Sequence, residues 1–154
     1  MEHGSMKGMS SNRLLLMGAI HLGIMYLLMY AMVNTLSNVI PNLNNFYMAG
    51  LMTSPMLALE AVLMGQMYAN KRVVRIILVV SLAAAVVFFS LIRAQTAVGD
   101  LELVRSMIPH HASAILMCEQ ADLQDSEVSI LCQSIIESQD AEIAQMNAIR
   151  ARLE

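Results

Sequence analysis

Residues 73–92 have the sequence VVRIILVVSLAAAVVFFSLI, and this stretch decides what kind of protein the chain can form. As a helix that rises about 1.5 Å per residue, it is long enough to cross a bilayer core of about 30 Å. Two other runs, 14–33 and 46–68, have the same character, and 57% of all residues are hydrophobic. The sequence therefore predicts an all-α chain whose residues 13–93 form a domain of three transmembrane helices.

Basic residues give this domain an expected orientation. Lys71, Arg72 and Arg75 lie at the link between the second and third runs, whereas the link 34–45 carries no charge. Because positive charge collects on the cytoplasmic side of a membrane, we expect the second link to be cytoplasmic. Residues 1–12 would then form a flexible cytoplasmic N-terminus, and the chain after the third run would lie outside.

The C-terminal segment 94–154 is acidic and amphipathic. It has ten Asp and Glu residues against three Arg, a formal net charge of −7, so it offers no basic face for nucleic acid. Apolar residues recur at helical spacing on both sides of 121–125, a short turn, and Asp125 or Ser126 can cap the second helix. A turn this short makes the two helices antiparallel, with positions that sum to about 250 at the same height.

This expected hairpin carries soft metal ligands. Met107-Ile108-Pro109-His110-His111 places two imidazoles beside a thioether, a ligand set that suits copper. Adjacent helical histidines point about 100° apart, which leaves open that one is a ligand and the other a core or interface residue. Gln139 would lie opposite His111 and fix an imidazole tautomer. The candidate ligands are Met107, His110, His111, Glu142 and Met146, with Met117 at the rim.

Two cysteines face one another near the turn of the same hairpin. Cys118 and Cys132 could form a disulfide in an oxidising compartment, or provide a second soft site as thiolates. Two small buried apolar residues are an equally good interpretation.

The first two apolar runs contain a second pattern, a residue with a sulfur or ionisable group every four positions. The members are Met17, His21, Met25 and Met29 in the first run, and Met48, Met52, Met56, Glu60 and Met64 in the second. In antiparallel neighbours, His21 would meet Glu60, and paired methionines would form a ladder. Such a ladder could carry Cu(I), since thioether sulfur favours this ion. Ionisable residues are costly inside a membrane, so the His21–Glu60 pair also suggests a function. Plain packing, with a His–Glu hydrogen bond, is the interpretation that we favour.

The motif Met107–His111 and the later residues Gln139, Glu142 and Met146 resemble a bacterial family, the domain of unknown function three hundred and five. This ferritin-like helical family includes CopM-type copper-binding proteins. The resemblance covers about residues 94–154, and the stretch Asn44–Met52 is similar to that of a three-span subgroup. It implies a copper-binding hairpin outside the cytoplasm, with the inherited ligands Met107, His110, His111 and Met146. Many members repeat the hairpin to form a four-helix bundle, so a homodimer, a higher homo-oligomer or the chain's own spans would have to complete this core.

The expected function is therefore copper capture for tolerance or delivery. The protein would lie in a bacterial inner (plasma) membrane, with a periplasmic hairpin that binds Cu(I) or Cu(II), and silver or zinc would compete. We expect no enzyme, because the sequence has no Ser-His-Asp pattern, phosphate loop or H-E-x-x-H signature. The alternatives are an oligomeric membrane scaffold without metal, and a copper-transport subunit that uses the methionine ladder.

Overall fold

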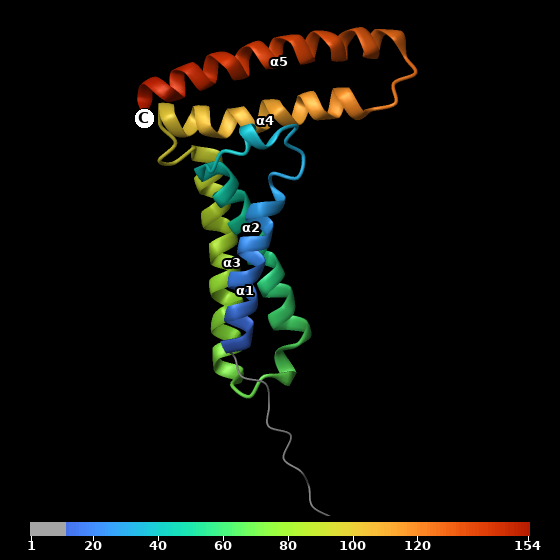
Figure 1. Ribbon diagram of the computed structural model, residues 1–154. Coiled ribbons are helices and arrows are strands. Elements are labelled where there is room, and N and C mark those ends of the chain that lie inside the picture. Colours follow the sequence, from blue (N-terminus) through green and yellow to red (C-terminus); the bar gives the residue numbers. More distant parts are fainter. Residues whose placement is uncertain (1–11) are drawn as a thin grey trace, which may run out of the picture. The chain divides into compact units, whose positions relative to one another are not determined.

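The computed structural model describes residues 12–154, and within them it contains helices and no strand. The α-helices are α1 (Asn12–Leu28), α2 (Leu43–Leu63), α3 (Lys71–Ala94), α4 (Asp100–Gln120) and α5 (Ser126–Leu153), with short 3₁₀ helices η1 (Leu36–Asn38) and η2 (Gly65–Met67) (Figure 1). The all-α expectation is confirmed for this part of the chain. The expected flexible N-terminus lies, except for Asn12, outside the described residues.

The first apolar run forms a shorter helix than expected. α1 has 17 residues and ends at Leu28, and the chain then turns. After the helix, the Tyr30 hydroxyl donates a hydrogen bond to the Ile40 carbonyl at 3.0 Å, and the Asn38 amide donates to Asn34 Oδ1 at 3.0 Å. These polar contacts hold the chain in a loop where hydropathy alone predicts more helix.

The expectation of three spanning helices is therefore corrected. Within residues 12–154, two helices, α2 and α3, are long and apolar enough to cross a membrane by length and composition. α1 is apolar but too short to meet the same criterion.

The described chain divides into two compact units, which we describe separately. The three-helix unit contains the chain up to Leu27 and residues 46–94, and the hairpin unit contains 28–45 and 95–154. The sequence placed a boundary near residue 94 but assigned 28–45 to the membrane domain. That assignment is wrong because residues 28–45 pack with the hairpin.

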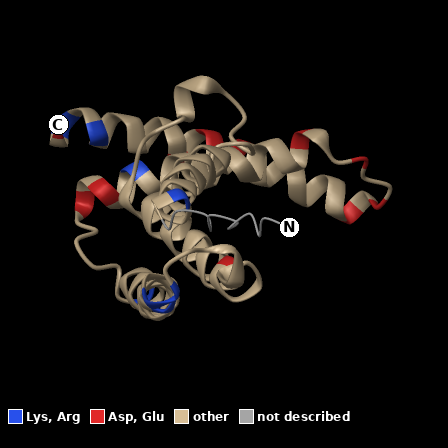
Figure 2. Cartoon of the chain, turned by 90° about the horizontal axis from the view of Figure 1, so that it is seen from below, with Lys and Arg blue, Asp and Glu red and all other residues tan. Residues whose placement is uncertain are grey.

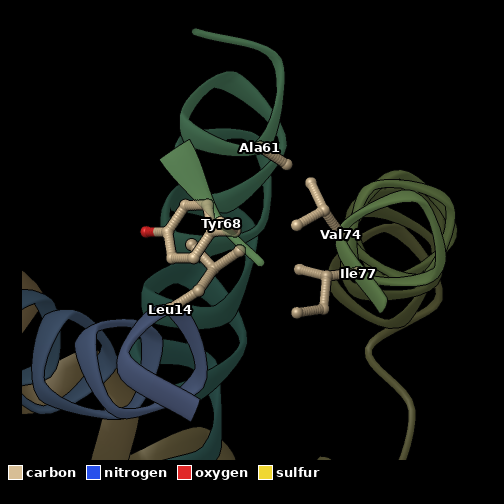
Figure 3. Close-up of a cluster of buried hydrophobic side chains, with 5 residues drawn as sticks. All are labelled: Leu14, Ala61, Tyr68, Val74 and Ile77. Atoms are coloured by element: carbon tan, nitrogen blue, oxygen red, sulfur yellow. The ribbon is translucent and has the colours of Figure 1, made fainter. Parts of the chain in front are cut away.

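In the three-helix unit, α1, α2 and α3 lie side by side (Figure 1). A buried apolar cluster joins them, with Leu14 from α1, Ala61 from α2, Val74 and Ile77 from α3, and Tyr68 from the link between α2 and α3 (Figure 3). α2 and α3 also approach closely at Gly50, where an added Cβ would lie 2.5 Å from the Phe88 ring. Phe88 in turn makes an edge-on contact with Phe46 at a centroid distance of 6.1 Å. Only a residue without a side chain leaves room for this ring.

In the hairpin unit, α4 and α5 run antiparallel (Figure 1). Of the two expected capping residues, Asp125 caps α5, because its carboxylate accepts hydrogen bonds from the backbone N–H groups of Glu127 and Val128 at 2.9 and 3.0 Å. Most acidic residues of the chain belong to this unit, including Asp122 and Asp125 at the link between its helices (Figure 2).

The core of the hairpin unit is completed by a segment from far earlier in the chain. Ile108, Ala112 and Ile115 of α4 meet Ile143 of α5, and Ile40 of the segment 28–45 joins the same cluster. This segment is fastened to α4, because the Leu43 N–H donates to Glu102 Oε2 at 3.0 Å and the Asn44 amide donates to Ser106 Oγ at 3.2 Å. The chain's own loop therefore covers apolar surface that a single hairpin would leave open.

A disulfide joins Cys118 and Cys132 beside the turn, with the two Cα atoms 5.2 Å apart. Of the interpretations left open by the sequence, this is the one that the structure contains. The positions sum to 250, in agreement with the expected register.

We expect Gly50→Ala to destabilise the three-helix unit by about 1–3 kcal/mol, because the added methyl group must displace Phe88 and its contact with Phe46. Thermal unfolding of the purified chain in mild detergent, followed by circular dichroism, measures the change. Gly23→Ala is the matched control, since a Cβ at Gly23 meets nothing within 4 Å. Equal unfolding midpoints for the two variants would show that α2 and α3 do not meet at Gly50.

We expect the double variant Cys118→Ser/Cys132→Ser to lose about 3 kcal/mol of stability, because the disulfide closes a loop with a sequence separation of 14. Reductant should lower the unfolding midpoint of the wild type and leave that of the double variant unchanged. Thiol labelling of the untreated, unfolded wild type should find no free cysteine. Two labelled thiols per chain would contradict the pairing.

Candidate metal-binding site

His111 is a buried polar residue in the core of the hairpin unit, with 6% of its surface exposed. Its Nδ1 lies 2.9 Å from the backbone carbonyl oxygen of Met107, one turn earlier on α4. A carbonyl oxygen only accepts hydrogen bonds, so Nδ1 carries a proton. The backbone of α4 thereby fixes the imidazole tautomer and the orientation of the ring.

The other ring nitrogen faces a carboxylate on the opposite helix. His111 Nε2 lies 2.7 Å from Glu142 Oε2. When Nε2 is protonated, the two groups form an ion pair across the hairpin. When it is not, a nitrogen lone pair and a carboxylate are close enough to bind one ion, since two ligands about 2.0 Å from a metal and at right angles lie about 2.8 Å apart.

Each helix carries a methionine one turn from a member of this pair. Met146 lies one turn after Glu142 and packs against the apolar cluster of the hairpin unit. Met107, whose carbonyl holds His111, has a half-buried side chain. Within residues 12–154, no group of three or more His, Cys, Asp or Glu side chains is placed to hold a metal. A site at His111 and Glu142 therefore depends on methionine sulfur for further ligands.

Two expected ligands lie at the edge of this arrangement. His110 is exposed, and its ring meets that of His111 edge-on with the centroids 6.0 Å apart. Met117 is exposed and lies beyond the turn of α4 that carries the histidines. The structure therefore brings His111 and Glu142 together, with Met107 and Met146 each one turn away on its own helix, and leaves His110 and Met117 exposed.

Gln139 does not fix the His111 tautomer as expected, because the two ring nitrogens face the Met107 carbonyl and Glu142, which lies one turn further along α5 than Gln139. Side chains on a helix lean toward its N-terminus. On two antiparallel helices, the residue numbers of two long side chains that meet therefore have a larger sum than those of two short side chains that meet. Gln139 is half-buried, and its Oε1 has no hydrogen-bond partner within the described part of the chain.

The expected pair of His21 and Glu60 in the three-helix unit is also wrong. Glu60 is buried, and its Oε1 accepts a hydrogen bond from the Tyr68 hydroxyl at 2.8 Å. α1 meets α2 through Gly18, where an added Cβ would lie 2.8 Å from Leu57. Figure 3 shows the Tyr68 hydroxyl pointing away from Val74 and Ile77. Sequence periodicity could not identify Tyr68 as the partner, because α2 ends between it and Glu60.

The methionines of the expected ladder do not form a paired file between α1 and α2. Met17, Met52, Met56 and Met64 are exposed, Met25 and Met48 are half-buried, and Met29 lies beyond the end of α1. Met17 and Met64, one of the expected pairs, nevertheless line a common cavity with Met56 and Glu60.

Comparison with known proteins places the hairpin in a described family. Residues 85–150 match the model described as domain of unknown function, DUF305. This match covers most of the hairpin unit and the end of α3. No solved structure matches the chain.

A relative extends the similarity beyond the hairpin. An uncharacterized protein of Acanthamoeba polyphaga mimivirus is 30% identical over 118 residues, which cover 75% of this chain and 76% of that protein. An alignment of this length cannot fit between residue 85 and Glu154, so it must include part of the three-helix unit. On the basis of the family match and this relative, the chain belongs to the DUF305 family.

Proposed function

We propose that the hairpin unit binds a copper ion through His111 Nε2 and the Glu142 carboxylate, with sulfur from Met146 and Met107 as further ligands. The observation that carries this proposal is the buried His111 ring, whose Nδ1 is held by the Met107 carbonyl and whose Nε2 lies 2.7 Å from Glu142 Oε2. A histidine that binds metal generally has its second nitrogen fixed in this way.

The ligand types favour copper over other ions. Imidazole suits copper in both common oxidation states, thioether sulfur suits Cu(I), and carboxylate oxygen suits harder ions such as Cu(II). Silver would compete through the sulfur atoms, and zinc through His111 and Glu142. The resemblance of the Met107–His111 motif to that of CopM-type members of the family supports the same choice.

We further propose that the three-helix unit anchors the hairpin to the outer side of an inner (plasma) membrane. Lys71, Arg72 and Arg75 lie at the start of α3, which would place that end in the cytoplasm and the following hairpin outside. The disulfide between Cys118 and Cys132 is typical of an oxidising compartment. Copper bound there would be held for tolerance or for delivery to another protein.

The test is a copper titration of the purified full chain in detergent, with a competing chelator, under oxidising and reducing conditions. We expect His111→Ala, Glu142→Gln and Met146→Leu each to weaken copper affinity by about 10–100-fold or more, because each removes a ligand. His110→Ala should weaken it less, since His110 is exposed.

His21→Ala is the matched control, because His21 lies in the three-helix unit and should leave the affinity unchanged. Circular dichroism verifies that the variants keep their helices. Wild-type affinity in the His111→Ala and Glu142→Gln variants would reject the proposal and leave these residues as a structural ion pair. In that case, a change of oligomeric state in metal-free detergent would favour the membrane scaffold.

A further inference from the structure

The three-helix unit contains a cavity of about 420 Å³, lined by α1, α2 and the link between α2 and α3. Three of its lining residues are methionines, Met17, Met56 and Met64. All three side chains are exposed and line the cavity, so their flexible thioethers are free to turn toward it.

Glu60 contributes the one carboxylate in this cavity lining. The residue is 8% exposed, and the Tyr68 hydroxyl donates a hydrogen bond to its Oε1 at 2.8 Å. The second oxygen, Oε2, is buried and has no hydrogen-bond partner among residues 12–154. A carboxylate in this position is unfavourable unless a positive charge or a donor compensates it. Arg13 lines the same cavity but makes no ion pair with Glu60.

We propose that this cavity binds a soft monovalent cation, Cu(I) or Ag(I), through the sulfur atoms of Met17, Met56 and Met64 and the carboxylate of Glu60. Thioether sulfur selects Cu(I) over hard cations such as Mg²⁺ and Ca²⁺, which require several oxygen ligands. A single positive charge balances Glu60, whereas a divalent ion would leave excess positive charge beside Arg13. The ligand type and the charge thus indicate the same class of ion.

This site shares no residue with the proposed copper site in the hairpin, so the two can be tested separately. The starting protein is the full chain with His110→Ala and His111→Ala, which removes the hairpin histidines. Ag(I) is the probe because it does not change oxidation state during the titration. Non-reducing conditions preserve the disulfide between Cys118 and Cys132, so that no thiol competes for silver.

Two changes to the cavity are then compared in this background. Glu60→Gln removes the charge and keeps an oxygen that accepts from Tyr68, so it should fold. The triple variant Met17→Leu/Met56→Leu/Met64→Leu removes the sulfur atoms with little change in volume. We expect the triple variant to bind one silver ion fewer per chain by elemental analysis after gel filtration, and Glu60→Gln to lower the affinity for that ion at least about tenfold.

Met52→Leu/Met67→Leu is the matched control, because these methionines are as exposed as those of the cavity but do not line it. It should bind as much silver as the starting protein. In methyl NMR spectra of the starting protein, the signals of Met17, Met56 and Met64 should shift with the first equivalents of Ag(I). Unchanged silver content in the triple variant and unchanged affinity in Glu60→Gln would overturn the proposal, whatever the outcome for copper at the hairpin.

Discussion

The contact between His111 and Glu142 is the constraint on which the hairpin depends. An imidazole buried at a helix contact is costly unless both nitrogens are satisfied, and here the Met107 carbonyl and the Glu142 carboxylate satisfy them. The pair also links α4 to α5 beside the apolar cluster. A metal would have to replace the proton between the two groups. The Glu142 side chain has room to move for this, since 54% of it is exposed.

The two ends of the hairpin are held by different means. Around His111, Ile40 from the segment 28–45 closes the apolar cluster over α4 and α5. Beyond Ile115, apolar packing is sparse, and Ile130 of α5 is 70% exposed. The disulfide lies at this end, where it supplies a covalent constraint in place of buried surface. The opposite end, which contains His111 and Glu142, depends on apolar packing and on the contact between these two side chains.

The parts of the fold that sequence predicted are those that local chemistry determines. Helical spacing, the five-residue link and the capping Asp125 define the hairpin, and short side chains such as Cys118 and Cys132 meet at the height of their Cα atoms. His111 meets Glu142 instead of Gln139 because longer side chains lean along the helix. Hydropathy predicted a longer helix than α1, because it does not account for the hydrogen bond between the Tyr30 hydroxyl and the Ile40 carbonyl. The docking of 28–45 is a contact between distant segments, which periodicity does not report.

A membrane anchor alone does not explain the three-helix unit. An anchor needs length and apolar surface, and α2 and α3 have both. It does not need a buried carboxylate, which lowers stability unless something compensates it, and replacement of such groups by apolar ones is often neutral or stabilising. One carboxylate oxygen of Glu60 accepts a hydrogen bond from the Tyr68 hydroxyl, and the other has no hydrogen-bond partner within the described chain. The similarity to the mimivirus protein also reaches into this unit. A function that uses both units therefore accounts for more of the molecule than one confined to the hairpin.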